Sequence, residues 1–146
     1  MSKSNTYEND LLLLIFNNTA IAKVGDASGV QPSATAGSLY VSLHTGDPGE
    51  GGDQTTSEAA YTSYARVAVA RSGAGWTVTA NAVENAAAIT FPAATGGSET
   101  ETYFGVGTDT SGVGKLLYSG ALTAGLAVSS GITPEFAAGE LDITED

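Results

Sequence analysis

The stretch LYVSLHTGDPG, residues 39–49, decides the fold class of this 146-residue chain. In its first half, Leu39, Val41 and Leu43 fall on one side of an extended chain, and the residues between them fall on the other. This period of two is typical of a half-buried strand. The GDPG sequence then ends the strand, because proline fixes φ and has no amide donor, whereas glycine accepts positive φ. The stretch therefore predicts a strand that closes in a tight turn.

Composition extends this interpretation to the whole chain. A chain of this length corresponds to about one domain, and its 19 glycines with only 14% charged residues favour short strands and tight turns. We expect a single domain over residues 1–146. There is no cysteine, which excludes disulfides, thiolate catalysis and zinc–thiolate sites.

The charge balance is strongly acidic. Sixteen acidic residues against five basic ones give a formal charge of -11, so binding to nucleic acid through its phosphates is not expected. Two interpretations stay open: the charge maintains solubility, or it guides assembly onto a basic partner surface.

No segment predicts membrane insertion or export. The longest apolar run, LLLLIF at residues 11–16, is far shorter than the roughly 20 residues of a membrane span. Glu8 and Asp10 occupy the place where a signal peptide carries basic residues. We expect a chain that is made and used without export.

A helix is predicted at residues 6–17. Ser4, Asn5 or Thr6 can cap it, and Glu8 in the first turn favours the helix dipole and can close a capping box. From residue 11 onward the apolar residues cover nearly the whole circumference, which indicates burial on more than one side. The helix either packs on its own domain alone or also docks on a neighbouring subunit.

Residues 23–38 are rich in glycine, serine, alanine and threonine and lack periodicity. This composition predicts a surface loop, or an arm that a partner orders.

The remaining chain alternates apolar runs with turn residues. Strands are predicted at residues 64–71, 76–79, 88–92, 99–106, 115–120, 122–128 and 140–144. We expect residues 81–85 to form a turn that joins two of these strands in a hairpin. Eight or nine short strands without intervening helical patterns indicate an all-β antiparallel domain that resembles a β-sandwich or jelly roll over residues 39–146, with one N-terminal α-helix.

Arg66 and Arg71 are two of only five cations. Because guanidinium groups form bidentate bonds with carboxylates, we expect each arginine to pair with an acid, inside the chain or across an interface. The candidate assembly contacts are Leu11, Leu12, Ile15, Phe16, Arg66 and Arg71.

The sequence predicts no catalytic, cofactor-binding or metal-binding residue, and therefore no enzyme. His44 is the only histidine, so no transition-metal site can be completed, and its outward parity indicates an exposed or hydrogen-bonded side chain. A serine, His44 and Asp47 could be drawn as a triad, but no nucleophile motif accompanies them. The sequence GVGK at residues 112–115 lacks the remaining residues of a phosphate loop and is interpreted as a turn.

Two acidic groups could attract a hard cation. They comprise Glu99, Glu101, Glu140, Asp142, Glu145 and Asp146. Their spacing matches no calcium loop, so we expect them to lie on solvated strand faces.

Four stretches together carry a family resemblance. They are residues 39–49, 64–69 (YARVAV), 85–92 (NAAAITFP) and 114–122 (GKLLYSGAL). Over residues 4–146 the chain resembles small structural proteins of tailed bacteriophages, which are frequently labelled tail-fibre proteins. The resemblance implies a virion component, made in the cytoplasm of the host bacterium, without catalytic residues.

Within the virion we expect a capsid decoration (cement) protein, a homotrimer that binds the major capsid protein or other virion proteins. A domain without coiled-coil heptads or fibrous repeats suits a knob or clamp better than a long fibre. The alternatives are a tail-fibre or tail-tip component that contacts the host, and a glycan-binding module with exposed tyrosines as its platform. Those tyrosines would be Tyr40, Tyr61, Tyr64, Tyr103 and Tyr118.

Overall fold

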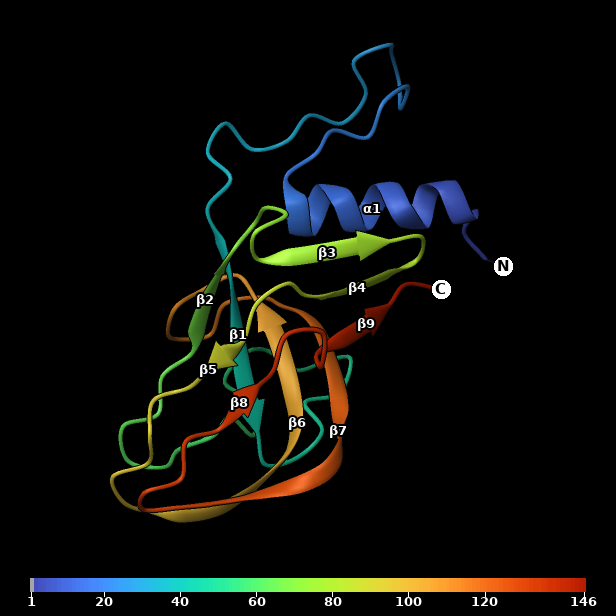
Figure 1. The fold of residues 1–146 in the computed structure, drawn as a ribbon. Coiled ribbons are helices and arrows are strands. Elements are labelled where there is room, and N and C mark those ends of the chain that lie inside the picture. Colours follow the sequence, from blue (N-terminus) through green and yellow to red (C-terminus); the bar gives the residue numbers. More distant parts are fainter. Residues whose placement is uncertain (1) are drawn as a thin grey trace. The chain divides into compact units, whose positions relative to one another are not determined.

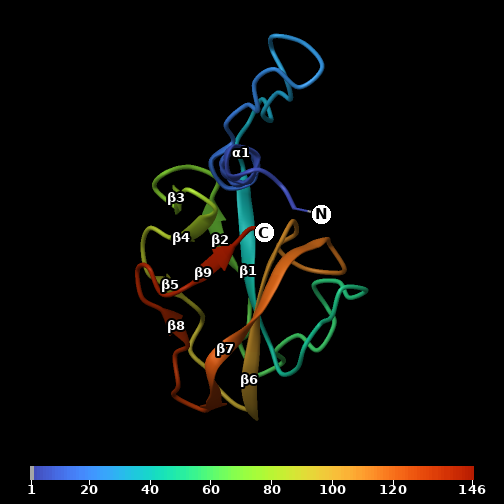
Figure 2. The ribbon, with the colours of Figure 1, turned by 90° about the vertical axis from the view of Figure 1, so that its right-hand side faces the viewer.

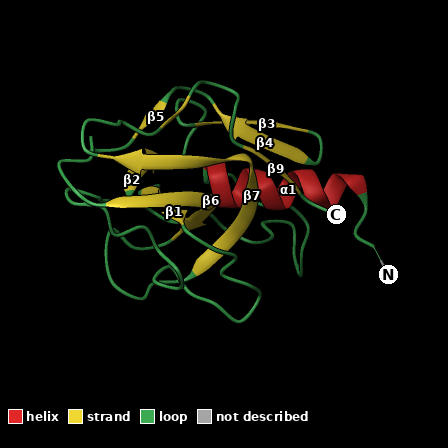
Figure 3. Ribbon diagram, turned by 90° about the horizontal axis from the view of Figure 1, so that it is seen from below, coloured by secondary structure: helices red, strands yellow, loops and turns green. Residues whose placement is uncertain are grey.

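The computed structural model describes residues 2–146, in which one helix and nine strands are present (Figure 1). They are α1 (Asn5–Asn17), β1 (Ser38–His44), β2 (Val67–Ala70), β3 (Trp76–Thr79), β4 (Ala82–Asn85), β5 (Ile89–Thr90), β6 (Ser98–Gly107), β7 (Leu116–Ser129), β8 (Glu135–Phe136) and β9 (Asp142–Thr144). Three sheets have the orders β2-β1-β6-β7, β3-β4-β9 and β5-β8. The pairings of β1 with β6, β6 with β7, β3 with β4, β4 with β9 and β5 with β8 are antiparallel. Figure 3 shows that strands and loops make up nearly all of the chain, which confirms the prediction of an all-β fold with one N-terminal helix.

The chain divides into two compact units, each built from separate segments. The helix unit comprises the chain up to Ser38, residues 70–88 and residues 137–146. The sheet unit comprises residues 39–69 and 89–136. The expectation of a single domain over residues 1–146 stays a prediction, and its first residue lies outside the described range.

The predicted helix is confirmed, one residue longer at its start. Ser4 is the N-cap, and its hydroxyl accepts a hydrogen bond from the Tyr7 amide at 3.4 Å. Asn18 ends the helix in the left-handed conformation (φ 54°), and its amide bonds to the Leu13 carbonyl. The expected capping box is wrong, because its acid belongs three residues after the cap, where Tyr7 stands, and Glu8 follows one position later.

The core of the helix unit forms where α1 lies along β3 (Figure 1). Glu8, Leu12 and Phe16, spaced by four residues, share the buried face of the helix. The rings of Phe16 and Trp76 pack edge to face with centroids 4.9 Å apart, and neither side chain has exposed surface. Trp76 therefore anchors this core.

The hairpin that follows differs from the prediction. β4 begins within the segment expected to be a turn at residues 81–85, and it pairs with β3 on one side and β9 on the other. The actual turn is Ala80 and Asn81, with Ala80 at φ 54°. The sequence of β4 has only one strong strand former, Val83, which lies opposite Ile143 of β9. Pairing with distant residues therefore decides this strand.

The core of the sheet unit is aromatic. β5 pairs with β8 rather than with β3, and Phe136 of β8 lies opposite Ile89. The ring of Phe136 contacts Phe104 of β6 and Phe91, with centroid distances of 6.3 and 6.2 Å. The two-stranded sheet thus packs on the larger sheet. In the larger sheet, β1 buries its predicted apolar face of Leu39, Val41 and Leu43.

The two strands predicted at residues 115–120 and 122–128 form one strand, β7, which runs beside β6 (Figure 2). Gly120, the last residue of the first predicted strand, lies opposite Phe104, and a Cβ there would come within 2.7 Å of the Phe104 ring. This glycine makes room for an aromatic ring. Further along, Thr102 of β6 faces residues 122–125 of β7 in a bulge, since the neighbouring pairs are Glu101 with Leu126 and Tyr103 with Ala121.

Arg71 joins the end of α1 to the loop before β1. Its guanidinium donates to the carbonyls of Leu14 (2.7 Å), Ile15 (2.6 Å) and Ala36 (3.1 Å) and to the Ser33 hydroxyl (3.3 Å). A cation at the C-terminal end of a helix satisfies carbonyls that have no partner within the helix. Arg71 therefore bonds carbonyls and a hydroxyl within the chain, and not the acid that the sequence predicts.

We predict that Arg71→Lys lowers the free energy of unfolding by about 1–3 kcal/mol, because a lysine ammonium cannot reproduce the planar fork that reaches several acceptors. Urea unfolding followed by circular dichroism measures the change. Lys115→Gln, which removes an exposed cation, is the control and should leave the midpoint unchanged. An Arg71→Lys midpoint equal to that of the wild type would contradict the role assigned to the guanidinium.

Candidate functional site

His44 lies in a buried polar cluster of the sheet unit, and its exposed surface is 0%. Its Nδ1 is 2.9 Å from the Thr56 carbonyl oxygen, and its Nε2 is 2.8 Å from Ser42 Oγ. Because a carbonyl only accepts, Nδ1 donates to Thr56, and Nε2 accepts from the Ser42 hydroxyl. Burial lowers the pKa of His44, which keeps the ring neutral. The prediction of a hydrogen-bonded histidine is confirmed and that of an exposed one is wrong.

The reason for this burial is the return of the chain after the GDPG turn. The Thr45 amide donates to the Ser57 carbonyl at 2.8 Å, and the Ala59 amide donates to the Leu43 carbonyl at 2.8 Å. The returning segment thus runs alongside the end of β1. Alternation alone cannot show that both faces of a strand are covered.

The serine–histidine pair does not form an active site. Ser42 and His44 have no exposed surface, so no substrate can reach the hydroxyl. Asp47, the third member of the triad that could be drawn, instead accepts a hydrogen bond from the Gly49 amide at 2.8 Å. The pair is a structural contact.

Gly105 of β6 closes this cluster. A Cβ at this position would lie 2.6 Å from His44 Nε2, 2.7 Å from Ser42 Oγ and 2.8 Å from a methyl carbon of Leu116. All three distances are shorter than real Cβ contacts.

We expect Gly105→Ala to destabilise the protein by about 1–3 kcal/mol, because the buried cluster must shift to admit the methyl group. Thermal unfolding measures this loss. Gly73→Ala is the matched control, since nothing lies within 4 Å of a Cβ at residue 73. Equal stabilities of the two variants would show that the cluster is not tightly packed.

Arg66 has the acid partner that the sequence predicts. Its Nε and Nη2 donate to the two carboxylate oxygens of Glu58 at 2.6 and 2.8 Å. The same guanidinium donates to the carbonyls of Asp109 (2.9 Å) and Gly112 (2.7 Å). The Tyr64 hydroxyl also donates to Glu58, at 3.1 Å. Arg66 is thus buried in contacts within its own chain, and it holds the turn predicted at residues 112–115.

The expected solvated position of Glu99 and Glu101 is wrong. Glu99 Oε1 accepts from the amides of Ala60 (2.8 Å) and Tyr61 (2.7 Å). Glu101 has no exposed surface, and neither of its carboxylate oxygens accepts a hydrogen bond. Burial and the neighbouring Glu99 carboxylate raise the pKa of Glu101 to about 8. The extra residues of the bulge lie on β7, so Glu101 keeps its parity in β6 and is buried on the face opposite to that of Phe104.

The C-terminal acids agree with the prediction in part, because only Asp142 lies on a strand. Glu140, Asp142 and Asp146 are exposed and Glu145 is half-buried. Within residues 2–146, no three His, Asp or Glu side chains gather closely enough to hold a metal ion.

Glu101 should make stability depend on pH. Its pKa rises from 4.5 to about 8 on folding, so between these values the unfolded chain has lost a proton that the folded chain retains. Stability should therefore fall as the pH rises through this window, by up to about 1.4 kcal/mol per pH unit for one proton.

We expect Glu101→Gln to remove this contribution, so that the variant gains stability relative to wild type from pH 5 to pH 8. Urea titrations at several pH values measure the difference. Glu140→Gln is the control with an exposed acid. A constant difference between wild type and Glu101→Gln across the window would contradict a buried protonated acid.

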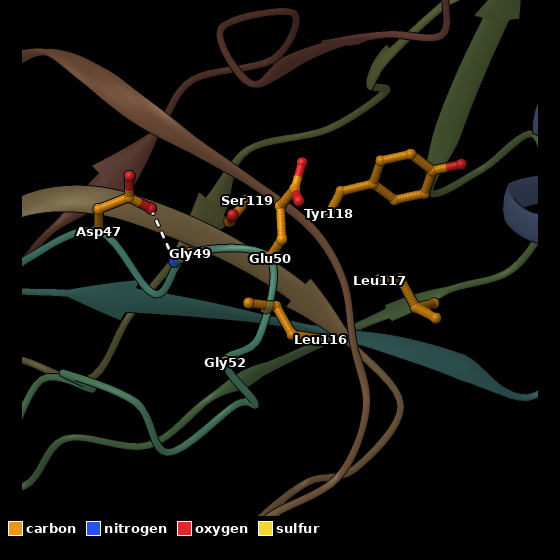
Figure 4. Close-up of a pocket in the computed structure, with 8 residues that line it drawn as sticks. All are labelled: Asp47, Gly49, Glu50, Gly52, Leu116, Leu117, Tyr118 and Ser119. Carbon is orange, nitrogen blue, oxygen red and sulfur yellow. Dashed lines mark hydrogen bonds between the residues drawn. The ribbon is translucent and has the colours of Figure 1, made fainter.

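A groove lies between the GDPG turn and the start of β7 (Figure 4). Its volume is about 400 Å³, within the usual range of ligand pockets. The residues that line it are Asp47, Gly49, Glu50, Gly52, Leu116, Leu117, Tyr118 and Ser119. One wall thus carries two exposed carboxylates, and the other carries the mainly apolar start of β7.

The turn wall of the groove is fixed by close backbone packing. The Gly52 amide donates to the Gly49 carbonyl at 3.1 Å, and a Cβ on Gly52 would overlap the Pro48 carbonyl. The β7 wall is the outermost strand of its sheet. Sequence reasoning missed this groove, although adjacent Leu116 and Leu117 give a signal, since alternation turns one of two adjacent leucines outward.

The candidate assembly contacts stay a prediction. Leu12 and Phe16 lie in the core of the helix unit with no exposed surface, whereas Leu11 and Ile15 are half-buried. Arg66 and Arg71 are engaged within the chain, as described above. Leu11 and Ile15 therefore keep surface with which a neighbour could make contact.

None of the tyrosines that the glycan-binding alternative would use as its platform is fully exposed. Tyr61 is only 3% exposed, and the other four tyrosines proposed for it are half-buried. Tyr64 stacks on Phe91 with ring centroids 6.3 Å apart. These rings serve mainly the fold.

No helix within residues 2–146 is long and apolar enough to cross a membrane.

Comparison with known proteins identifies one family. The family model described as "Podophage GP4 fiber I protein gp80" matches residues 2–144. No curated protein matches the chain significantly. The matched range includes the helix, all nine strands and the groove.

Proposed function

The chain belongs to the podophage GP4 fiber I protein gp80 family, and from this premise we propose that it is a non-enzymatic component of a bacteriophage fibre. Membership supports a structural protein of the virion, in agreement with the resemblance seen in the sequence. The family match over nearly the whole chain is the observation that carries this proposal.

The finer location on the particle rests on the family description. The sequence led us to expect a trimeric capsid decoration protein, with a tail-fibre component as an alternative. The word "fiber" in the family description favours the second location. Capsid decoration stays a prediction that the same experiment tests.

The internal chemistry of the described residues supports a structural role. His44, Arg66 and Glu101 have the chemistry most often used in active sites, and all three are buried. His44 and Arg66 make hydrogen bonds within the sheet unit. A shared fold alone would not justify assigning a structural role, because function resides in particular sites.

The proposed partners are further copies of the chain and other virion proteins. The formal charge of -11 suits a basic patch on such a partner. Leu11 and Ile15 of α1, which are half-buried, are candidate contacts with that partner.

We predict that antibodies against this protein label the tail of intact particles, seen by immunogold electron microscopy. Antibodies against the major capsid protein on the same particles are the control. Gel densitometry should give a small copy number per virion, since fibres are few. Labelling over the capsid with hundreds of copies would instead establish a decoration protein.

A further inference from the structure

The loop at residues 21–30 is ordered by its own hydrogen bonds. Ile21 and Val30 exchange two backbone hydrogen bonds of 3.0 and 2.8 Å, which close the loop at its base. Inside it, Asp26 Oδ1 accepts from the amides of Ser28 (2.7 Å) and Gly29 (3.0 Å). Figure 1 shows this 21–30 loop projecting from α1 on the side away from β3. A loop fixed in this way loses little conformational entropy when it binds.

The 21–30 loop exposes apolar groups beside a cation. Val24 is 49% exposed and Val30 is 41% exposed, and they are among the most exposed large apolar side chains of the described residues. Lys23 is exposed next to Val24. The loop thus presents an apolar knob with one positive charge.

This cation is scarce in so acidic a chain. Of five basic residues, Arg66 and Arg71 are engaged internally and Lys3 forms an ion pair with Glu145 at 3.1 Å. Lys23 and Lys115 form no ion pair among the described residues. Two copies with a charge of -11 repel each other, so a stable contact between them should place one of these lysines against an acid.

The groove beside β7 has the complementary chemistry. Glu50 and Asp47 line one wall, and Asp47 keeps one carboxylate oxygen beyond the one that binds Gly49. Leu117, which is 36% exposed, and Leu116 line the other wall. The groove can therefore receive apolar side chains and one cation together.

We propose that the 21–30 loop of one copy docks in the groove of a second copy, with Val24 against Leu117 and Lys23 facing Glu50. This inference deepens the proposed structural function, because it names the partner as a second copy of the chain. It rests on the proposed function only in that self-assembly is taken as part of the protein's role. Loop and groove are different surfaces, so the contact is heterologous and repeats from copy to copy. Such contacts close into a ring when the rotation allows, and the expected homotrimer would be such a ring.

The absence of cysteine permits a direct test. Val24→Cys and Leu117→Cys are made as separate full-length variants, mixed and oxidised mildly with diamide. A disulfide between the two variants can form only between copies. Non-reducing gels should show about ten-fold more cross-linked dimer than a mixture of Val24→Cys with Val113→Cys, because docking raises the effective concentration of the thiols.

Val113 is the matched control because it is 63% exposed and lies outside the groove. Equal cross-linking in the two mixtures would overturn the proposal. Because the measurement uses purified protein, it is independent of where the protein lies on the particle. A fibre protein without this cross-link would refute the inference alone, and a cross-linked protein found on the capsid would refute the proposed function alone.

Exchange of charges tests the lysine separately. Lys23→Glu and Glu50→Lys should each raise the dissociation constant of self-association about ten-fold, and the double variant should restore it, because the exchanged pair attracts again. Sedimentation velocity measures the constant. Glu84→Lys, an equal change of charge at an exposed site outside the groove, is the control. A monomeric wild-type protein, or a double variant weaker than either single one, would also overturn the proposal.

Discussion

The buried pairing of Arg66 with Glu58 is the interaction on which the sheet unit depends. A buried guanidinium is costly unless all its donors are satisfied, and removing one partner of such a pair typically costs about 3–5 kcal/mol. Here Arg66 joins the segment that returns after β1 to the turn that precedes β7. Gln54 reinforces the same connection, because its amide side chain bonds both the backbone N–H (2.9 Å) and the carbonyl (3.3 Å) of Asp109. One groove wall ends at Gly52, shortly before Gln54, and the other begins at Leu116, shortly after Gly112. The contacts of Arg66 and Gln54 therefore position both walls.

The elements that the sequence predicts correctly are those decided by neighbouring residues. β1 follows from its alternation, and α1 from its cap and apolar run. β4 and β7 were misjudged because distant residues decide them: Val83 lies opposite Ile143, and Gly120 opposite Phe104. A glycine in a strand has the same local signal whether it begins a turn or makes room for a ring. Only the register between strands separates these two cases.

The same limit applies to the site. The acid partner of Arg66 follows from the bidentate bonds that guanidinium forms with carboxylates, whereas the same expectation fails for Arg71, which bonds carbonyls and a hydroxyl. The burial of His44 and Glu101 could not be seen, because alternation does not show that both faces of a strand are covered. The groove combines Glu50 with Leu117, residues far apart in sequence. Periodicity describes one segment at a time, whereas a groove depends on how two segments lie next to each other.

The acidity of the chain limits which of its surfaces can meet when copies assemble. At physiological ionic strength the Debye length is about 8 Å, so most of the repulsion between two like-charged copies is screened until their surfaces nearly touch. Orientation is then decided by the few charges within that distance. With only five cations, of which three are engaged internally, the chain has few ways to face another copy without opposing carboxylates. A high net charge thus maintains solubility and at the same time restricts self-contact to the places where a lysine is exposed.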